Sequence, residues 1–170
     1  MTTNKIKVIS KAIRWLILSL SAVAVAYLLW SFFYQGTYNF NSDSTQFQQL
    51  WYESEANKGA LFLYTAPGLI LWAVLVYWAC RLLSSFEQGN YFSQESIRCY
   101  LWLVWVQVAM FVGHILFTLG ISFYHRQLFE DSVTMLSLDL TEIFILFFMV
   151  VVLHVLKAAR QIEQENKEFI

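Results

Sequence analysis

Four long stretches without a single Asp, Glu, Lys or Arg constrain this chain more than any other feature. They cover residues 15–42, 59–80, 99–125 and 143–156. Each contains an apolar segment close to the ~20 residues that a helix needs to cross the hydrocarbon core of a bilayer. Because lipid offers the backbone no hydrogen-bond partners, such segments cross membranes as helices. The sequence therefore predicts an all-α protein with four membrane spans.

The composition agrees with lipid as the main surrounding of the chain. Hydrophobic residues make up 58% of the sequence and charged residues only 14%, whereas soluble domains carry roughly 25% charged residues. The net charge of −1 gives no sign of a polyanionic partner. We therefore expect contact with a lipid bilayer and no direct binding of nucleic acid.

We predict a single integral membrane domain over residues 1–170, in which polar segments separate the spans. We predict a four-helix transmembrane bundle with spans at about 15–33, 61–83, 97–123 and 138–156. The basic residues 1–14 form a head before the first span, which we interpret as an uncleaved anchor. Residues 84–98 form a polar turn that we call the elbow. Residues 157–170 form a charged tail, which we expect to continue the fourth helix.

The distribution of positive charge predicts the orientation. Eight of the 11 Lys and Arg residues belong to the head, the elbow and the tail, Arg81 lies three residues before the elbow, and only Lys58 and Arg126 belong to the other two connections. Short loops rich in Lys and Arg stay on the cytoplasmic side. We therefore predict that both termini and the elbow face the cytoplasm.

The elbow is the most patterned polar segment of the chain. Gly89 suits the left-handed residue that ends a helix, Ser93 suits the cap of the next helix, and Glu95 then falls in its first turn. This pattern fits a capped turn, and it also fits a surface that contacts a cytoplasmic partner. The candidate contact residues are Phe86, Glu87, Gly89, Phe92, Ser93, Glu95 and Arg98.

Two further features of the sequence leave alternatives open. Phe47, Leu50 and Trp51 share one helical face, which fits a short helix lying in the membrane interface or an irregular loop with scattered aromatic residues. Pro67, the only proline, either begins the regular part of the second span or kinks it.

Ionisable residues inside spans are candidates for function because they are costly in lipid. His114 and Glu142 both fall near the outer side, where they form a candidate intramembrane polar pair. The pair fits either a hydrogen-bonded interfacial glutamate or a protonatable couple. His125 falls outside the predicted span. The spacing of the residues shows no catalytic set, metal site or cofactor motif, so we expect no enzyme. Cys80 and Cys99 are expected to remain free thiols.

At the elbow the sequence resembles the small bacterial membrane proteins catalogued as domain of unknown function 2975. The residues that carry this resemblance are Phe86, Glu87, Gly89, Phe92, Ser93 and Glu95, together with Glu165, Asn166 and Ile170 near the end of the chain. The resemblance departs at Ser96, Tyr100 and residues 167–169. It implies a four-span protein of the bacterial cytoplasmic (inner) membrane, often encoded beside a small helix-turn-helix transcription regulator.

Together these features predict a non-enzymatic sensory or regulatory membrane protein that presents the elbow and the tail to a soluble regulator. One alternative is a small transporter or proton-coupled carrier that uses His114 and Glu142. Another is a structural subunit of a membrane complex. A homo-oligomer is compatible with each of these functions.

Overall fold

The computed structural model describes residues 2–36, 45–54, 56–129 and 140–168, and all regular structure within them is helical. The prediction of an all-α protein is confirmed. In chain order the elements are α1 (Thr2–Trp30), the π-helical turn η1 (Ser31–Gln35), α2 (Thr45–Tyr52), α3 (Lys58–Glu87), α4 (Gln94–Leu128) and α5 (Leu140–Glu168).

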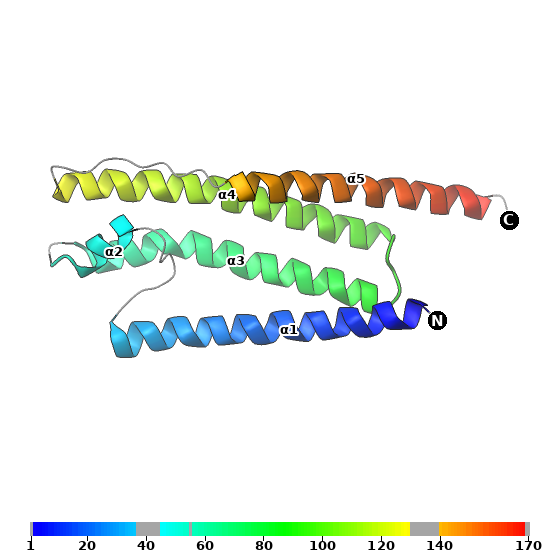
Figure 1. The fold of residues 1–170 in the computed structure, drawn as a ribbon, viewed down its shortest axis with the longest axis horizontal. Helices are drawn as coiled ribbons and strands as arrows, with labels where there is room; N and C mark the ends of the chain where they lie inside the picture. The colour runs from blue at the N-terminus through cyan, green and yellow to red at the C-terminus, as the bar shows by residue number, and fades with distance from the viewer. Residues whose placement is uncertain (1, 37–44, 55, 130–139, 169–170) are drawn as a thin grey trace.

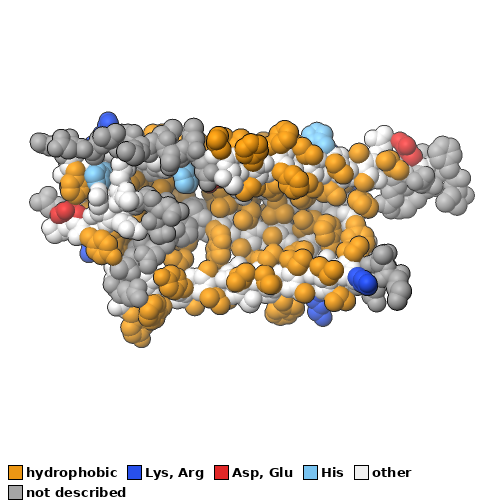
Figure 2. All heavy atoms as spheres, in the orientation of Figure 1, with side chains coloured by type: hydrophobic (Ala, Val, Ile, Leu, Met, Phe, Trp, Pro, Cys, Tyr) orange, Lys and Arg blue, Asp and Glu red, His pale blue; other side chains and the backbone are white. Residues whose placement is uncertain are grey.

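Within the described residues, four helices are long and apolar enough to cross a membrane. These candidate spans are Lys5–Tyr34, Lys58–Glu87, Gln94–Leu128 and Leu140–Ile162. Figure 2 shows hydrophobic side chains spread over the middle of the visible face. A surface of this kind is stable in lipid but not in water. The chain is thus a multi-pass membrane protein.

The four long helices form an open bundle. α1 packs against α3, α3 against α4, and α4 against α5, so that α1 and α5 lie at opposite edges (Figure 1). The most apolar stretches of α1 and α5 are each only 6% buried by protein, against 17% for α4. Lipid can therefore reach most of the two outer helices.

The head, the elbow and the tail lie at one end of the molecule. Figure 1 places both termini and the turn between α3 and α4 at the same end, with α5 reaching furthest beyond it. The head is part of the first long helix, because α1 is already helical from Thr2. The tail continues the fourth helix as predicted, up to Glu168. The predicted span start at residues 138–139 and the last residues, 169–170, lie outside the described residues.

The opposite end of the molecule, which we call the far end, is closed by α2. Phe47 and Leu50 are 0% exposed and Trp51 is 4% exposed. They pack on Leu61 of α3 and Ile121 of α4. Of the two alternatives for this segment, the helix is correct. Its apolar face is covered by protein, whereas the sequence suggested a helix lying in the membrane interface.

Two side-chain bonds fix α2 to the last turns of α4. The Ser122 hydroxyl donates to Gln46 Oε1 at 2.9 Å, and His125 Nε2 lies 2.9 Å from Gln49 Oε1. α4 continues to Leu128, five residues past the predicted span end at residue 123, and His125 lies in this extension. His125 is 7% exposed, so it is a buried partner of α2 rather than a loop residue.

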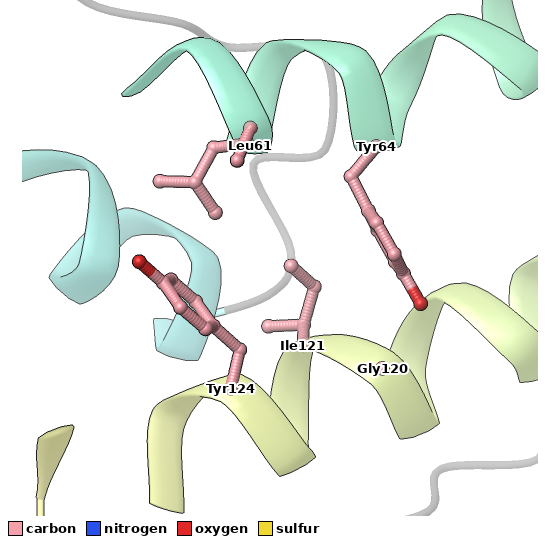
Figure 3. Close-up of a pocket in the computed structure, with 6 residues that line it drawn as sticks. Leu61, Tyr64, Gly120, Ile121 and Tyr124 are labelled. Carbon is pink, nitrogen blue, oxygen red and sulfur yellow. The ribbon is translucent and has the colours of Figure 1, made fainter. Parts of the chain in front are cut away.

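Next to α2, α3 and α4 approach each other very closely at Gly120. Figure 3 shows Tyr64 of α3 pointing toward Gly120 of α4, beside a small cavity of about 140 Å³. A Cβ atom at Gly120 would lie 1.6 Å from the Tyr64 hydroxyl, so only glycine fits without moving this ring. Pro67 lies inside α3, well after its start at Lys58, and therefore does not begin the helix.

Candidate functional site

The elbow reverses the chain between α3 and α4 through two local devices. Gly89 has φ +86°, the left-handed conformation that glycine adopts without strain. The Ser93 side chain accepts a hydrogen bond of 3.1 Å from the Ser96 backbone N–H and so caps α4. Glu95 lies in the first turn of α4, near the positive end of the helix dipole. The roles predicted for these three residues are confirmed.

A cluster of serines holds the two helix ends together beneath this turn. The Ser85 and Ser96 hydroxyls lie 2.8 Å apart, and the Ser93 and Ser96 hydroxyls lie 3.0 Å apart. Ser96 also donates to the backbone carbonyl of Asn90. Ser85 is 7% and Ser96 2% exposed. Because buried hydroxyls are costly without partners, this cluster fixes the shape of the elbow.

The head covers one side of the elbow. Arg14 Nε lies 3.3 Å from Glu87 Oε1, with the Arg14 side chain 26% and the Glu87 side chain 19% exposed. The Lys7 side chain lies over Gly89, where a Cβ atom would be 3.1 Å from Lys7 Cε. The first turns of α1 are therefore part of this site, and two of the head's positive charges are directed onto the elbow.

A second ion pair joins the end of α3 to the start of α4. Arg81 Nη2 donates to Glu95 Oε1 at 3.0 Å, and Arg81 Nη1 donates to the Tyr77 hydroxyl at 3.2 Å. The guanidinium carbon also lies 5.5 Å from the centre of the Trp78 ring, within the range of a cation–π contact. Arg81 is thus held in one orientation although it is exposed.

The tail meets the elbow across a cavity. Ile97 at the start of α4 and four polar residues of α5 line a space of about 380 Å³; the α5 residues are Lys157, Arg160, Gln161 and Gln164. Closer to the middle of α5, Met149 packs on a core formed by Leu82, Cys99 and Leu103. This apolar contact places the tail beside the elbow and leaves its cations at the shared surface.

Residues 15–170 match the family described as "Protein of unknown function (DUF2975)". The chain belongs to the DUF2975 family. The resemblance seen at the elbow is thereby confirmed, and it extends over nearly the whole chain. No curated protein and no solved structure matches the sequence.

The seven candidate contact residues of the elbow fall into two groups in the structure. Phe86, Glu87, Gly89 and Ser93 contact other parts of the same chain, through the core, the head or the helix cap. Phe92, Glu95 and Arg98 are exposed. The first group builds the elbow, and only the second group offers side chains to a partner. That a partner binds there stays a prediction.

His114 and Glu142 lie in different surroundings. His114 is exposed on α4 and lines an apolar groove of about 440 Å³ with Pro67, Gly68 and Gly113 among others. Glu142 is half-buried in the first turn of α5. The ion pairs recorded among the described residues are Arg14–Glu87 and Arg81–Glu95. The predicted pairing of His114 with Glu142 is therefore still a prediction.

No group of three His, Cys, Asp or Glu side chains in the described part of the chain could hold a metal ion. Cys80 and Cys99 are both free, and Cys99 is 1% exposed. Sequence reasoning missed the pairing of Ser85 with Ser96 and of Arg14 with Glu87. One signal was available, because Ser85 and Ser96 stand in the last and the first turn of the two helices that the elbow joins.

Proposed function

We propose that this DUF2975 protein is a non-enzymatic regulatory protein of the bacterial cytoplasmic membrane. Its elbow and tail together hold a soluble regulator at the membrane surface. The observation that carries this proposal is the cavity between Ile97 and the cations of α5, because it makes the elbow and the tail one continuous surface. A surface built from two segments far apart in sequence suits recognition of a folded partner.

The charge distribution supports a cytoplasmic position for this surface. Nine of the 11 Lys and Arg residues lie in or directly beside the head, the elbow and the tail, and cytoplasmic connections carry such an excess. The three segments lie at the same end of the molecule (Figure 1). Both termini then face the cytoplasm, where a soluble partner is available.

The chemistry of the surface indicates the character of the partner. Phe92 is 39% exposed, Lys157 is exposed, and Arg160 is half-buried. A surface that carries an exposed aromatic residue on the elbow and cations on the tail suits a partner with an apolar contact and an acidic rim. We propose that this partner is a helix-turn-helix transcription regulator, as the family resemblance implies. The partner, and not this chain, would then contact nucleic acid.

The proposal is tested by affinity capture from gently solubilised membranes. The wild-type chain is expected to recover a soluble helix-turn-helix regulator. The double variant Lys157→Gln/Arg160→Gln should recover about five- to tenfold less, because it removes two charges from the shared surface. The control Lys5→Gln/Lys11→Gln removes two exposed head charges at the same end and should leave capture unchanged. Equal capture by wild type and the tail variant would refute the proposal.

A second candidate function rests on the groove that contains His114. The groove lies between α3 and α4 beside Pro67 and Gly68, and an ionisable group at such a place suits a proton-coupled carrier. Purified protein in sealed vesicles should then catalyse a flux that His114→Ala or Glu142→Ala abolishes. The regulatory proposal expects no such flux from either the wild type or the variants.

A further inference from the structure

A second cavity opens at the elbow. It has a volume of about 450 Å³ and lies between the end of α3 and the start of α4. Its lining consists of Trp78, Arg81, Gln94, Glu95, Arg98 and Cys99. Two cations and one anion therefore meet around one space. Glu95 and Arg98 are also candidate partner contacts, but the test of the regulatory proposal changes only Lys157 and Arg160 of the tail.

The first cation of the cavity is already oriented. Arg81 bonds to Glu95 at 3.0 Å and to Tyr77 at 3.2 Å, and it lies over the Trp78 ring. A guanidinium has more N–H donors than these two bonds use. Because its position is fixed in advance, Arg81 loses little side-chain freedom when the remaining donors bind a ligand.

The second cation supplies the uncompensated charge. Arg98 is exposed, one turn after Gln94 on α4. Within the described residues it belongs to neither of the two ion pairs, since Glu95 is bonded to Arg81 and Glu87 to Arg14. The cavity thus presents one net positive charge and the donors of two guanidinium groups. Planar guanidinium donors bind the paired oxygens of a phosphate or a carboxylate through two parallel hydrogen bonds.

The aromatic residues beside the cavity favour a lipid phosphate as the bound anion. The Trp78 and Trp102 rings are stacked, with centroids 5.5 Å apart and planes 6° apart. Trp102 does not line the cavity itself; it is 44% exposed on α4 and extends the aromatic surface beside it. Tryptophan side chains collect at the level of the lipid headgroups. A ligand with a charged head and apolar chains fits this combination of cations and aromatic rings better than a free ion does.

We propose that the cavity binds the phosphate of an anionic phospholipid headgroup. Arg81 and Arg98 hold the phosphate oxygens, Glu95 keeps Arg81 in position, and the two tryptophans pack beside the upper acyl chains. Basic pockets between membrane helices bind anionic headgroups in this way. The site is separate from Lys157 and Arg160, so it stands whether or not a soluble regulator binds the tail.

The test is thermal unfolding of the full chain in a neutral detergent, with one addition at a time. Phosphatidylglycerol should raise the Tm in a dose-dependent manner, because a ligand that binds only the folded state stabilises it. Phosphatidylcholine and inorganic phosphate at the same concentrations should not. In Arg98→Gln the apparent affinity for phosphatidylglycerol should fall about fivefold or more. Lys11→Gln removes an exposed charge at the same end and should respond as the wild type does.

The outcomes separate the two sources of the ligand. Equal stabilisation of Arg98→Gln and the wild type by phosphatidylglycerol would overturn the site. Stabilisation by inorganic phosphate alone would show an anion site and overturn the lipid as its ligand. Arg81→Gln provides a second variant, and the number of lipids retained by each protein in native mass spectrometry provides a second measurement. Retention that is the same in both arginine variants and in Lys11→Gln would also overturn the proposal.

Discussion

Different kinds of contact hold the helices together at the two ends of this membrane protein. At the far end, α2 closes the space between α3 and α4 with a core that includes Phe47, Leu50 and Trp51. At the elbow end, hydroxyls, an N-cap and ion pairs hold the helices. At the far end, aromatic residues of α2 pack in the protein core. At the elbow end, charged groups stay exposed around a fixed turn. The contrast indicates that the far end contributes more to the packed core, and it fits our proposal that the elbow end holds a partner.

The largest expected effect comes from removing the core of the far end. Phe47 is 0% exposed, and Phe→Ala changes at such sites cost about 3–5 kcal/mol. We expect Phe47→Ala to lower the free energy of unfolding by about this amount, measured by denaturation in detergent. The matched control Phe33→Ala, at a side chain that is 74% exposed, should have little effect. Similar losses in both variants would remove the distinction between the core and the lipid-facing surface.

A smaller effect is expected at the serine cluster of the elbow. Ser96→Ala leaves the buried Ser85 hydroxyl without its partner at 2.8 Å and removes one of the two hydroxyl donors to the Asn90 carbonyl. We expect a loss of about 1–3 kcal/mol, because unpaired buried polar groups cost about this much. Ser19→Ala serves as the control, since Ser19 bonds only within its own helix. If Ser96→Ala is as stable as that control, the serine cluster does not fix the turn.

The contact between the head and the elbow should contribute least to stability. Arg14 and Glu87 are 3.3 Å apart and both largely shielded, so a coupling energy of about 1 kcal/mol is expected from a double-mutant cycle with Arg14→Gln and Glu87→Gln. The coupling should fall only slightly in high salt, because salt screens partly buried pairs much less than exposed ones. A coupling of zero at low salt would show that α1 does not hold the elbow.

Local chemistry made much of the elbow predictable. The left-handed Gly89, the Ser93 cap and the place of Glu95 depend on residues within one or two turns, so the sequence alone indicated them. The four helices followed equally from charge-free apolar runs. These features need no knowledge of which helices are neighbours in space.

Contacts between distant segments were not predictable in the same way. The Gln49–His125 contact joins residues 76 positions apart, and the Arg14–Glu87 pair depends on how α1 packs against α3. The apolar face of α2 indicated a helix but not whether lipid or protein covers it. Periodicity reveals that a face is apolar, and only the packing shows what lies against it.

The orientation of the two ends is tested most directly by comparing their thiol labelling in intact cells. Phe92 at the elbow and Tyr52 at the far end are both exposed, and each is replaced by cysteine in a chain carrying Cys80→Ala and Cys99→Ala. An impermeant thiol reagent added outside should label Tyr52→Cys and leave Phe92→Cys unlabelled until the membrane is permeabilised. Labelling of Phe92→Cys in intact cells would place the elbow outside and contradict its role in holding a cytoplasmic regulator.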